Sequence, residues 1–145
     1  MEDYHNYEII HTLPYEIYRI MILDKKNKPT VSELEILKVL WTKNSATVRD
    51  VHEELLQTKG AGYTTTLKLM QIMFEKGLVT RNSSSKTHIY QPAVSKENTQ
   101  NLFLNKMIDS LFSGSSAKLV MQALGNHKAS KEELEEIKNY LNNIK

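Results

Sequence analysis

Side chains that donate hydrogen bonds or carry positive charge recur over a short stretch near the middle of the chain. They are Tyr63, Thr64, Thr65, Thr66, Lys68 and Gln71. Hydroxyl and ammonium groups contact phosphate oxygens, a threonine methyl fits the methyl group of thymine, and a glutamine amide pairs with the edge of adenine. These residue types favour contacts with double-stranded DNA, although Thr64 can also serve only as a helix cap.

The charge of the surrounding stretch fits the same chemistry. Residues 59–92 contain five basic residues and one acidic residue, whereas the whole chain of 145 residues has a formal net charge of only +2. A local basic patch is typical of a surface that binds nucleic acid or an acidic partner. A solvated face rich in lysine has the same composition, so charge alone leaves both interpretations open. Further candidate contacts to DNA are Arg49, Arg81, Lys86 and His88.

Other chemistries lack the residues that they need. The chain has no cysteine, which excludes disulfides, thiolate metal sites, iron–sulfur clusters and a cysteine nucleophile. Residues 52–56 begin like the helix of a zinc protease but lack its second histidine. The five histidines show no spacing typical of metal ligands, and the five glycines form no phosphate-binding loop. We therefore predict no metal, no cofactor and no enzymatic activity.

Two capping boxes predict the helices that precede this stretch. Ser32 and Glu35 have the spacing of a capping box that opens a helix over residues 33–43. Thr47 and Asp50 have the same spacing and predict a second helix, which ends near residue 57.

A third helix and a β-hairpin follow. The third helix is predicted over residues 65–76, with Thr64 as its N-cap and Gly77 as a left-handed C-terminal cap. Residues 78–81 and 87–90 then alternate between apolar and polar side chains around a polar turn, which predicts a hairpin.

The order of three helices and a hairpin is that of a winged helix-turn-helix. In this fold the third helix enters the major groove with its N-terminal residues foremost, and the hairpin, or wing, contacts phosphates or the minor groove. The asparagine, serines and lysine of residues 82–86 suit such a wing. Some winged helices bind protein instead, so the pattern alone leaves that alternative open.

The C-terminal third of the chain predicts three more helices. They are expected from Ser95 to about residue 112, over residues 116–124, and from a capping box of Ser130 and Glu133 to about residue 143. The first has more apolar surface than a lone surface helix needs, which favours a partner helix from a second chain over packing beneath the last two helices. The candidate dimerisation residues are Phe103, Leu104, Met107, Ile108, Leu111 and Phe112.

These predictions combine into a mainly α fold with three parts. Residues 1–28 are an N-terminal appendage, residues 29–93 are a winged-helix DNA-binding domain, and residues 94–145 are a helical dimerisation domain. The chain has no run of about 18 apolar residues, and its acidic N-terminus makes a poor signal peptide. We therefore expect a cytoplasmic protein.

Several segments of the chain resemble the penicillinase-repressor family, the BlaI/MecI type of bacterial repressor. The segments are residues 29–37, 39–41, 47–51, 62–66, 75–79 and 88–92. The similarity runs from about Pro29 to the C-terminus and is most specific up to residue 92. The resemblance implies a homodimeric repressor, with N-terminal winged helices on a palindromic DNA operator and intertwined C-terminal helices.

The resemblance also has implications for induction. Members that sense copper have clustered C-terminal cysteines, so the absence of cysteine excludes that branch. Other members are inactivated when a membrane sensor metalloprotease switches on and the repressor is cut at an Asn-Phe bond near the start of the dimerisation helix. The corresponding residues here are Asn101, Leu102 and Phe103. The intervening leucine departs from the pattern of the family and leaves the position of a cut open.

Two functions of different classes fit the sequence. One is a dimeric DNA-binding repressor, and the other is a winged-helix adaptor that binds protein without operator specificity. The positive charge concentrated in residues 59–92 favours the repressor, because an adaptor would not need it.

Overall fold

The computed structural model describes residues 28–58, 60–126 and 129–144, and the chain divides after Lys96 into two compact units. The predicted appendage over residues 1–28 lies outside the described residues except for Lys28. The boundary proposed between two domains after residue 93 stays a prediction. None of the helices in the described part combines the length and the apolar character needed to cross a membrane.

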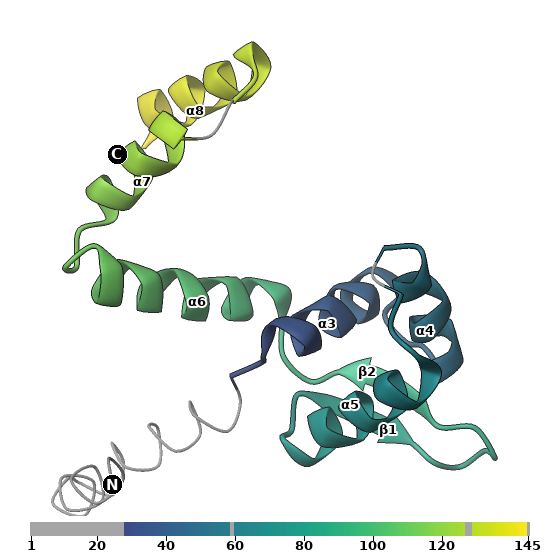
Figure 1. The fold of residues 1–145 in the computed structure, drawn as a ribbon. Coiled ribbons are helices and arrows are strands. Elements are labelled where there is room, and N and C mark those ends of the chain that lie inside the picture. Colours follow the sequence, from purple (N-terminus) through teal and green to yellow (C-terminus); the bar gives the residue numbers. More distant parts are fainter. Residues whose placement is uncertain (1–27, 59, 127–128, 145) are drawn as a thin grey trace, which may run out of the picture. The chain divides into compact units, whose positions relative to one another are not determined.

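Three helices form the framework of the first unit (Figure 1). They are α3 (Val31–Lys43), α4 (Val48–Leu56) and α5 (Tyr63–Glu75). Each of the three helices packs against the other two. The capping box of Thr47 and Asp50 opens α4 as predicted.

A two-stranded antiparallel hairpin completes this unit. It consists of β1 (Val79–Asn82) and β2 (Ile89–Pro92), each beginning one or two residues later than predicted. Ala46, between α3 and α4, exchanges two backbone hydrogen bonds of 3.0 and 2.9 Å with Tyr90 of β2. This bridge ties the hairpin to the helices. The mainly α fold with an N-terminal winged helix-turn-helix is therefore confirmed.

The helix α3 begins two residues earlier than predicted. Its N-cap is Thr30, whose hydroxyl accepts from the backbone of Glu33 at 3.2 Å, while Glu33 Oε2 accepts from the backbone of Thr30 at 2.9 Å. The predicted capping box of Ser32 and Glu35 is wrong, because both residues already lie inside α3, whose capping box is formed by Thr30 and Glu33. Both pairs have the required spacing, so the burial of Glu33 decides between them.

The helix α5 also begins earlier, at Tyr63. Its N-cap is Gly62, which has no side chain to cap the helix, so the prediction of Thr64 as N-cap is wrong. It ends at Glu75, one residue earlier than predicted, but the predicted cap is confirmed, because Gly77 has a left-handed φ of 78° and Leu78 donates to the carbonyl of Met73 at 2.9 Å. The cap takes up Leu78, which is why β1 begins one residue later.

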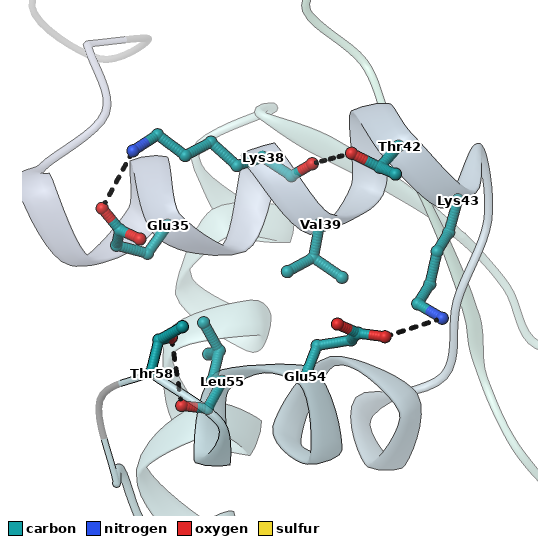
Figure 2. A pocket seen from close by; sticks show the side chains of 8 residues that line it. All are labelled: Glu35, Lys38, Val39, Thr42, Lys43, Glu54, Leu55 and Thr58. Carbon is teal, nitrogen blue, oxygen red and sulfur yellow. Dashed lines mark hydrogen bonds and ion pairs between the residues drawn. The ribbon is translucent and has the colours of Figure 1, made fainter.

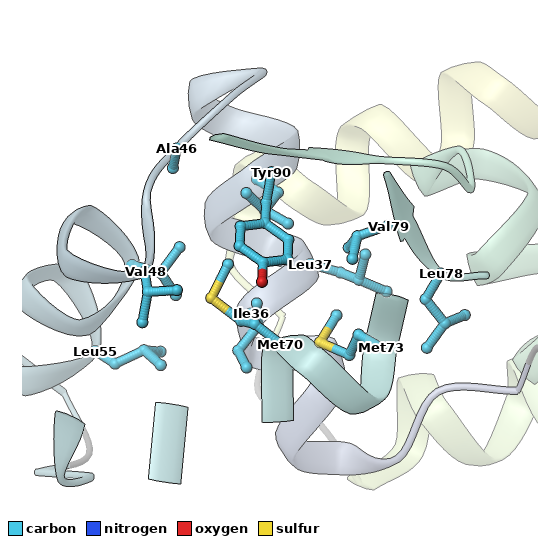
Figure 3. Packing of buried hydrophobic residues seen from close by; sticks show 12 residues of the cluster. Ile36, Leu37, Ala46, Val48, Leu55, Met70, Met73, Leu78, Val79 and Tyr90 are labelled. Carbon is cyan, nitrogen blue, oxygen red and sulfur yellow. The ribbon is translucent and has the colours of Figure 1, made fainter. Parts of the chain in front are cut away.

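The core of the first unit draws apolar side chains from all three helices and the hairpin (Figure 3). Tyr90 points from β2 into the middle of this cluster. The buried apolar residues are Ile36, Leu37, Leu40, Ala46, Val48, Val51, Leu55, Met70, Met73, Leu78, Val79 and Tyr90. At its edge, the indole nitrogen of Trp41 donates to the carbonyl of Val94 at 2.9 Å and holds the chain that leaves the hairpin.

A buried ion pair joins the start of α3 to the end of α5. Lys76 Nζ lies 2.7 Å from Glu33 Oε2, and the Glu33 side chain is 3% exposed. The same ammonium donates to the carbonyl of Lys28 at 3.2 Å. A buried carboxylate is costly unless it is paired and hydrogen-bonded, and Glu33 satisfies both requirements. The pair removes Lys76 from the basic patch that the sequence indicates.

The second unit consists of α6 (Lys96–Leu111), α7 (Ser116–Asn126) and α8 (Lys131–Asn143). Ser113 and Gly114 both have left-handed φ angles and follow the end of α6 at Leu111. The predicted interruption of the helix at Gly114 is therefore confirmed. The predicted capping box of Ser130 and Glu133 opens α8. No apolar side chain described in this unit is buried.

Replacing Lys76 by methionine should destabilise the first unit. The aliphatic stem is retained but the Glu33 carboxylate is left buried without its cation. We expect a loss of about 3 kcal/mol in the free energy of unfolding, the low end for a broken buried pair, because Lys76 is partly exposed. Urea unfolding followed by the fluorescence of Trp41, the single tryptophan, measures this loss.

Lys38→Met is the matched control, since it breaks the exposed pair with Glu35 and should cost less than about 1 kcal/mol. Equal losses in the two variants would contradict the importance of the buried pair.

Candidate nucleic-acid interface

A groove between α5 and the hairpin brings together residues from three parts of the first unit. Arg49 comes from α4, Tyr63 and Gln71 come from α5, and Lys86 and His88 come from the loop that joins the strands. All five were predicted from the sequence as contacts to DNA. Sequence reasoning missed the further lining residues, namely Val48, Leu67, Thr87 and Tyr90.

The exposed face of α5 continues from this groove. Thr64, Thr65 and Lys68 are exposed, as is Gln71. Residues three and four positions apart share one side of a helix, so Thr64, Lys68 and Gln71 form a polar row. Lys68 forms no ion pair with any residue that the structure describes, which leaves its charge available at this surface.

Thr66 lies on the opposite side of α5 from this row. It is fully buried, and its hydroxyl donates to the carbonyl of Gly62 at 3.3 Å. A buried hydroxyl offers no surface to a DNA groove, so the contact predicted for Thr66 does not fit the fold. The sequence shows three successive threonines, and only the packing of α5 against the core tells them apart.

Arg81 is engaged by an aromatic ring and does not line the groove. It stands opposite Tyr90 in the hairpin, and its guanidinium lies 4.1 Å from the centroid of the Phe74 ring on α5. A guanidinium stacked on a ring gains a cation–π attraction, which anchors β1 to the end of α5. The structure therefore gives Arg81 a role in holding the hairpin against α5.

The start of α4 presents Arg49 beside a charged cap. Arg49 pairs with Glu53 at 3.3 Å, and both side chains are well exposed. Asp50 Oδ2 accepts from the backbone nitrogen of Thr47 at 2.9 Å and from its hydroxyl at 2.8 Å. These hydrogen bonds, with smaller contributions from Lys43 and Arg49, lower the pKa of the Asp50 carboxyl. The cap thus keeps a negative charge at the positive end of the α4 dipole.

An aromatic pair spans the turn between α4 and α5. The ring of His52 meets the ring of Tyr63 edge to face, with centroids 5.6 Å apart and planes at 88°. His52 is half-buried in the structure. At the hairpin, the rings of His88 and Tyr90 lie at a tilt to each other, with their centroids 6.4 Å apart.

A second hollow lies between α3 and α4 (Figure 2). Val39 and Leu55 contribute its apolar part, and Lys43 faces Glu54 across it at 3.2 Å. Lys38 pairs with Glu35 of its own helix at 3.1 Å. Because carboxylates of the hollow neutralise its own lysines, this face lacks the net positive charge that a phosphate backbone requires.

The three helices, the hairpin and the bridge to β2 define a winged-helix protein. The chain belongs to the penicillinase repressor family, whose model matches residues 29–143. It is 24% identical to the methicillin resistance regulatory protein MecI of Staphylococcus aureus strain N315, over 77% of this chain and 90% of the relative. It is 23% identical to a penicillinase repressor of Staphylococcus aureus, over 83% of this chain and 96% of the relative.

A penicillinase repressor of Bacillus licheniformis is 24% identical, over 77% of this chain and 89% of that protein. Among solved structures, the solution structure of the DNA-binding domain of the repressor BlaI superposes with a TM-score of 0.45 at 22% identity. That match covers 50% of this chain and 88% of the other.

Replacing Asp50 by asparagine should make the stability of the first unit less dependent on pH. Asparagine still accepts hydrogen bonds at the cap but has no charge. Because the folded-state pKa of Asp50 lies below its ordinary value of 3.8, its charge stabilises the fold above that value and this contribution disappears as the pH falls through the folded-state pKa. We expect the wild type to exceed the variant by about 0.5 kcal/mol near neutral pH.

Urea unfolding at a series of pH values, followed by Trp41 fluorescence, measures this difference. The two proteins should converge as the pH falls below the folded-state pKa of Asp50. A difference that stays constant over the whole range would show that the charge of Asp50 does not matter.

Proposed function

We propose that this protein is a homodimeric transcriptional repressor that binds a palindromic operator in double-stranded DNA. The observation that carries the proposal is the groove that joins Arg49, Gln71 and Lys86 beside the exposed polar row of α5. Membership of a repressor family supports it, as do the repressor and regulatory names of its relatives. Binding promoter DNA also implies a cytoplasmic location.

The N-terminal half of α5 is the part that we place in the major groove. Tyr63, Thr64 and Thr65 form its first turn, where backbone amides without helical partners point toward an incoming phosphate or base. Lys68 is positioned to neutralise a phosphate, and Gln71 can read an adenine. On the wing, Lys86 and His88 reach toward the backbone or the minor groove.

The second unit supports dimerisation because its helices leave many apolar side chains exposed. These are Leu104, Met107, Leu111, Val120, Met121, Leu134, Tyr140, Leu141 and Ile144. Phe103, Ile108 and Phe112, the other candidates from the sequence, are half-buried. Surface helices of a stable monomer rarely expose so much apolar surface, so we propose that a second copy of the chain covers it. A two-fold dimer matches a palindromic operator.

We further propose that repression is relieved by proteolysis in α6 under the control of a membrane sensor metalloprotease. Asn101, Leu102 and Phe103 all lie within this helix. A cut there would separate the winged helix from most of the helices proposed to dimerise, and would thereby lower affinity for a two-part operator.

Selection of duplexes from a randomised pool with the full-length protein tests the DNA-binding proposal. Fluorescence anisotropy then compares an enriched duplex with its scrambled counterpart. Enrichment of a palindrome that binds more tightly than the scrambled duplex would support the repressor. Failure to enrich any sequence would contradict it and favour the protein-binding adaptor.

Removing Lys68 or Lys86 should reduce the salt dependence of binding to the enriched duplex. Each phosphate contact releases about one counterion, so Lys68→Ala and Lys86→Ala should each flatten the slope of log K against log salt by about one unit per protomer. Anisotropy titrations at several salt concentrations measure the slope. Lys38→Ala, in the hollow between α3 and α4, is the control and should leave the slope unchanged. Unaltered slopes for both test variants would remove these lysines from the interface.

Placing two acidic residues on the apolar face of α6 should dissociate the dimer. Met107→Glu with Leu111→Glu would bury two unpaired charges in the proposed interface, so we expect the dimer dissociation constant to rise at least about 100-fold. Sedimentation equilibrium measures it. Lys106→Glu, which adds an acidic group to the polar side of the same helix, should remain dimeric. A wild type that is already monomeric would refute the proposed dimer.

A further inference from the structure

The contacts proposed above include Tyr63 but give no role to His52, whose ring packs against it at the turn between α4 and α5. Tyr63 is the first residue of α5, and its side chain is 48% exposed beside the groove. His52 packs against it edge to face from α4, in the geometry that aromatic rings prefer. A contact between the two helices of the helix-turn-helix therefore lies directly behind an exposed ring.

At its Nδ1 side, the ring of His52 is held by packing and not by a hydrogen bond. Its Nδ1 atom is buried and has no hydrogen-bond partner among the described residues. An unpaired buried nitrogen costs free energy, so this nitrogen does not explain the position of the ring. The observed partner of the ring is Tyr63.

Tyr63 lines two hollows of the first unit. One is the groove that it shares with Gln71 and Lys86. The other is lined by Arg49, His52, Glu53, Leu56 and Tyr63. His52 lines this second hollow together with Tyr63, so its ring borders the space beside the phenol.

Among the residues that the structure describes, the ring that contacts Tyr63 is that of His52. The N-cap is Gly62, which makes no side-chain hydrogen bond. A half-exposed tyrosine without such restraint would lose rotamer freedom on binding, whereas a ring that is already held loses less.

We infer that His52 is a positioning residue that fixes the Tyr63 ring toward the groove, and that this pair sets part of the base-sequence preference of the protein. The inference rests on the proposed DNA binding. Phosphate contacts carry no sequence information, whereas contacts to base edges and thymine methyls do. His52 therefore acts on the affinity for the enriched duplex and leaves the affinity for a scrambled duplex unchanged.

A double-mutant cycle on the full-length protein tests this role. The probes are the enriched duplex and its scrambled counterpart, with anisotropy as the readout. His52→Ala should weaken binding to the enriched duplex about threefold to tenfold, the range expected for loss of an edge-to-face pair. Binding to the scrambled duplex should not change. In a Tyr63→Ala background, His52→Ala should add no further loss.

Two further variants separate positioning from a loss of stability. His52→Phe keeps a ring and lacks the unpaired nitrogen, so it should restore binding to within about twofold of the wild type. Leu56→Ala removes an apolar side chain from the same hollow but no ring partner of Tyr63, so it should bind as the wild type does. Melting temperatures of all variants, followed by circular dichroism, report any loss of folding.

The outcomes distinguish this inference from the proposed function. If the wild type enriches no sequence, the repressor proposal falls and this inference falls with it. If the wild type discriminates between the duplexes but the losses from His52 and Tyr63 are additive, only the inference is overturned. Equal weakening on both duplexes, or failure of His52→Phe to restore binding, would also overturn it.

Discussion

The winged helix depends most on the interactions of the buried Glu33 carboxylate, which are an ion pair and a hydrogen bond. The carboxylate accepts from the backbone of Thr30 and so begins α3, and it pairs with Lys76 and so joins α3 to the end of α5. Lys76 in turn reaches the carbonyl of Lys28, where the described chain begins. A charge that is 3% exposed must be satisfied in this way, which makes the geometry of its partners specific.

This pair also shapes the electrostatics of the candidate interface. It neutralises Lys76 at one end of α5, while Lys68 stays exposed on the polar row and Lys86 lies on the wing. The left-handed turn at Gly77 and the stacking of Arg81 on Phe74 hold the hairpin at that same end. These contacts anchor the C-terminal end of α5, whereas its first turn, which begins with Tyr63, borders the groove.

The two units stabilise themselves by different means. The described part of the first unit buries twelve apolar residues in one cluster, which is a core of its own. In the second unit the described helices bury no apolar side chain, although their sequences are amphipathic. Helices of this length are only marginally stable in water without tertiary packing. The second unit, unlike the first, therefore needs another protein surface to cover its apolar side chains.

The sequence alone determined the order of the helices and the hairpin. It also determined two of the three predicted capping boxes and the cap at Gly77, because hydrophobic periodicity and capping act over a few residues. Tertiary structure alone decided the remainder. It chose Thr30 and Glu33 over a second pair with the same spacing, buried Thr66 and set His52 behind Tyr63. Each decision depends on contacts between distant residues, such as the 43 positions that separate Glu33 from Lys76, and no local pattern encodes which of several similar side chains meets a partner.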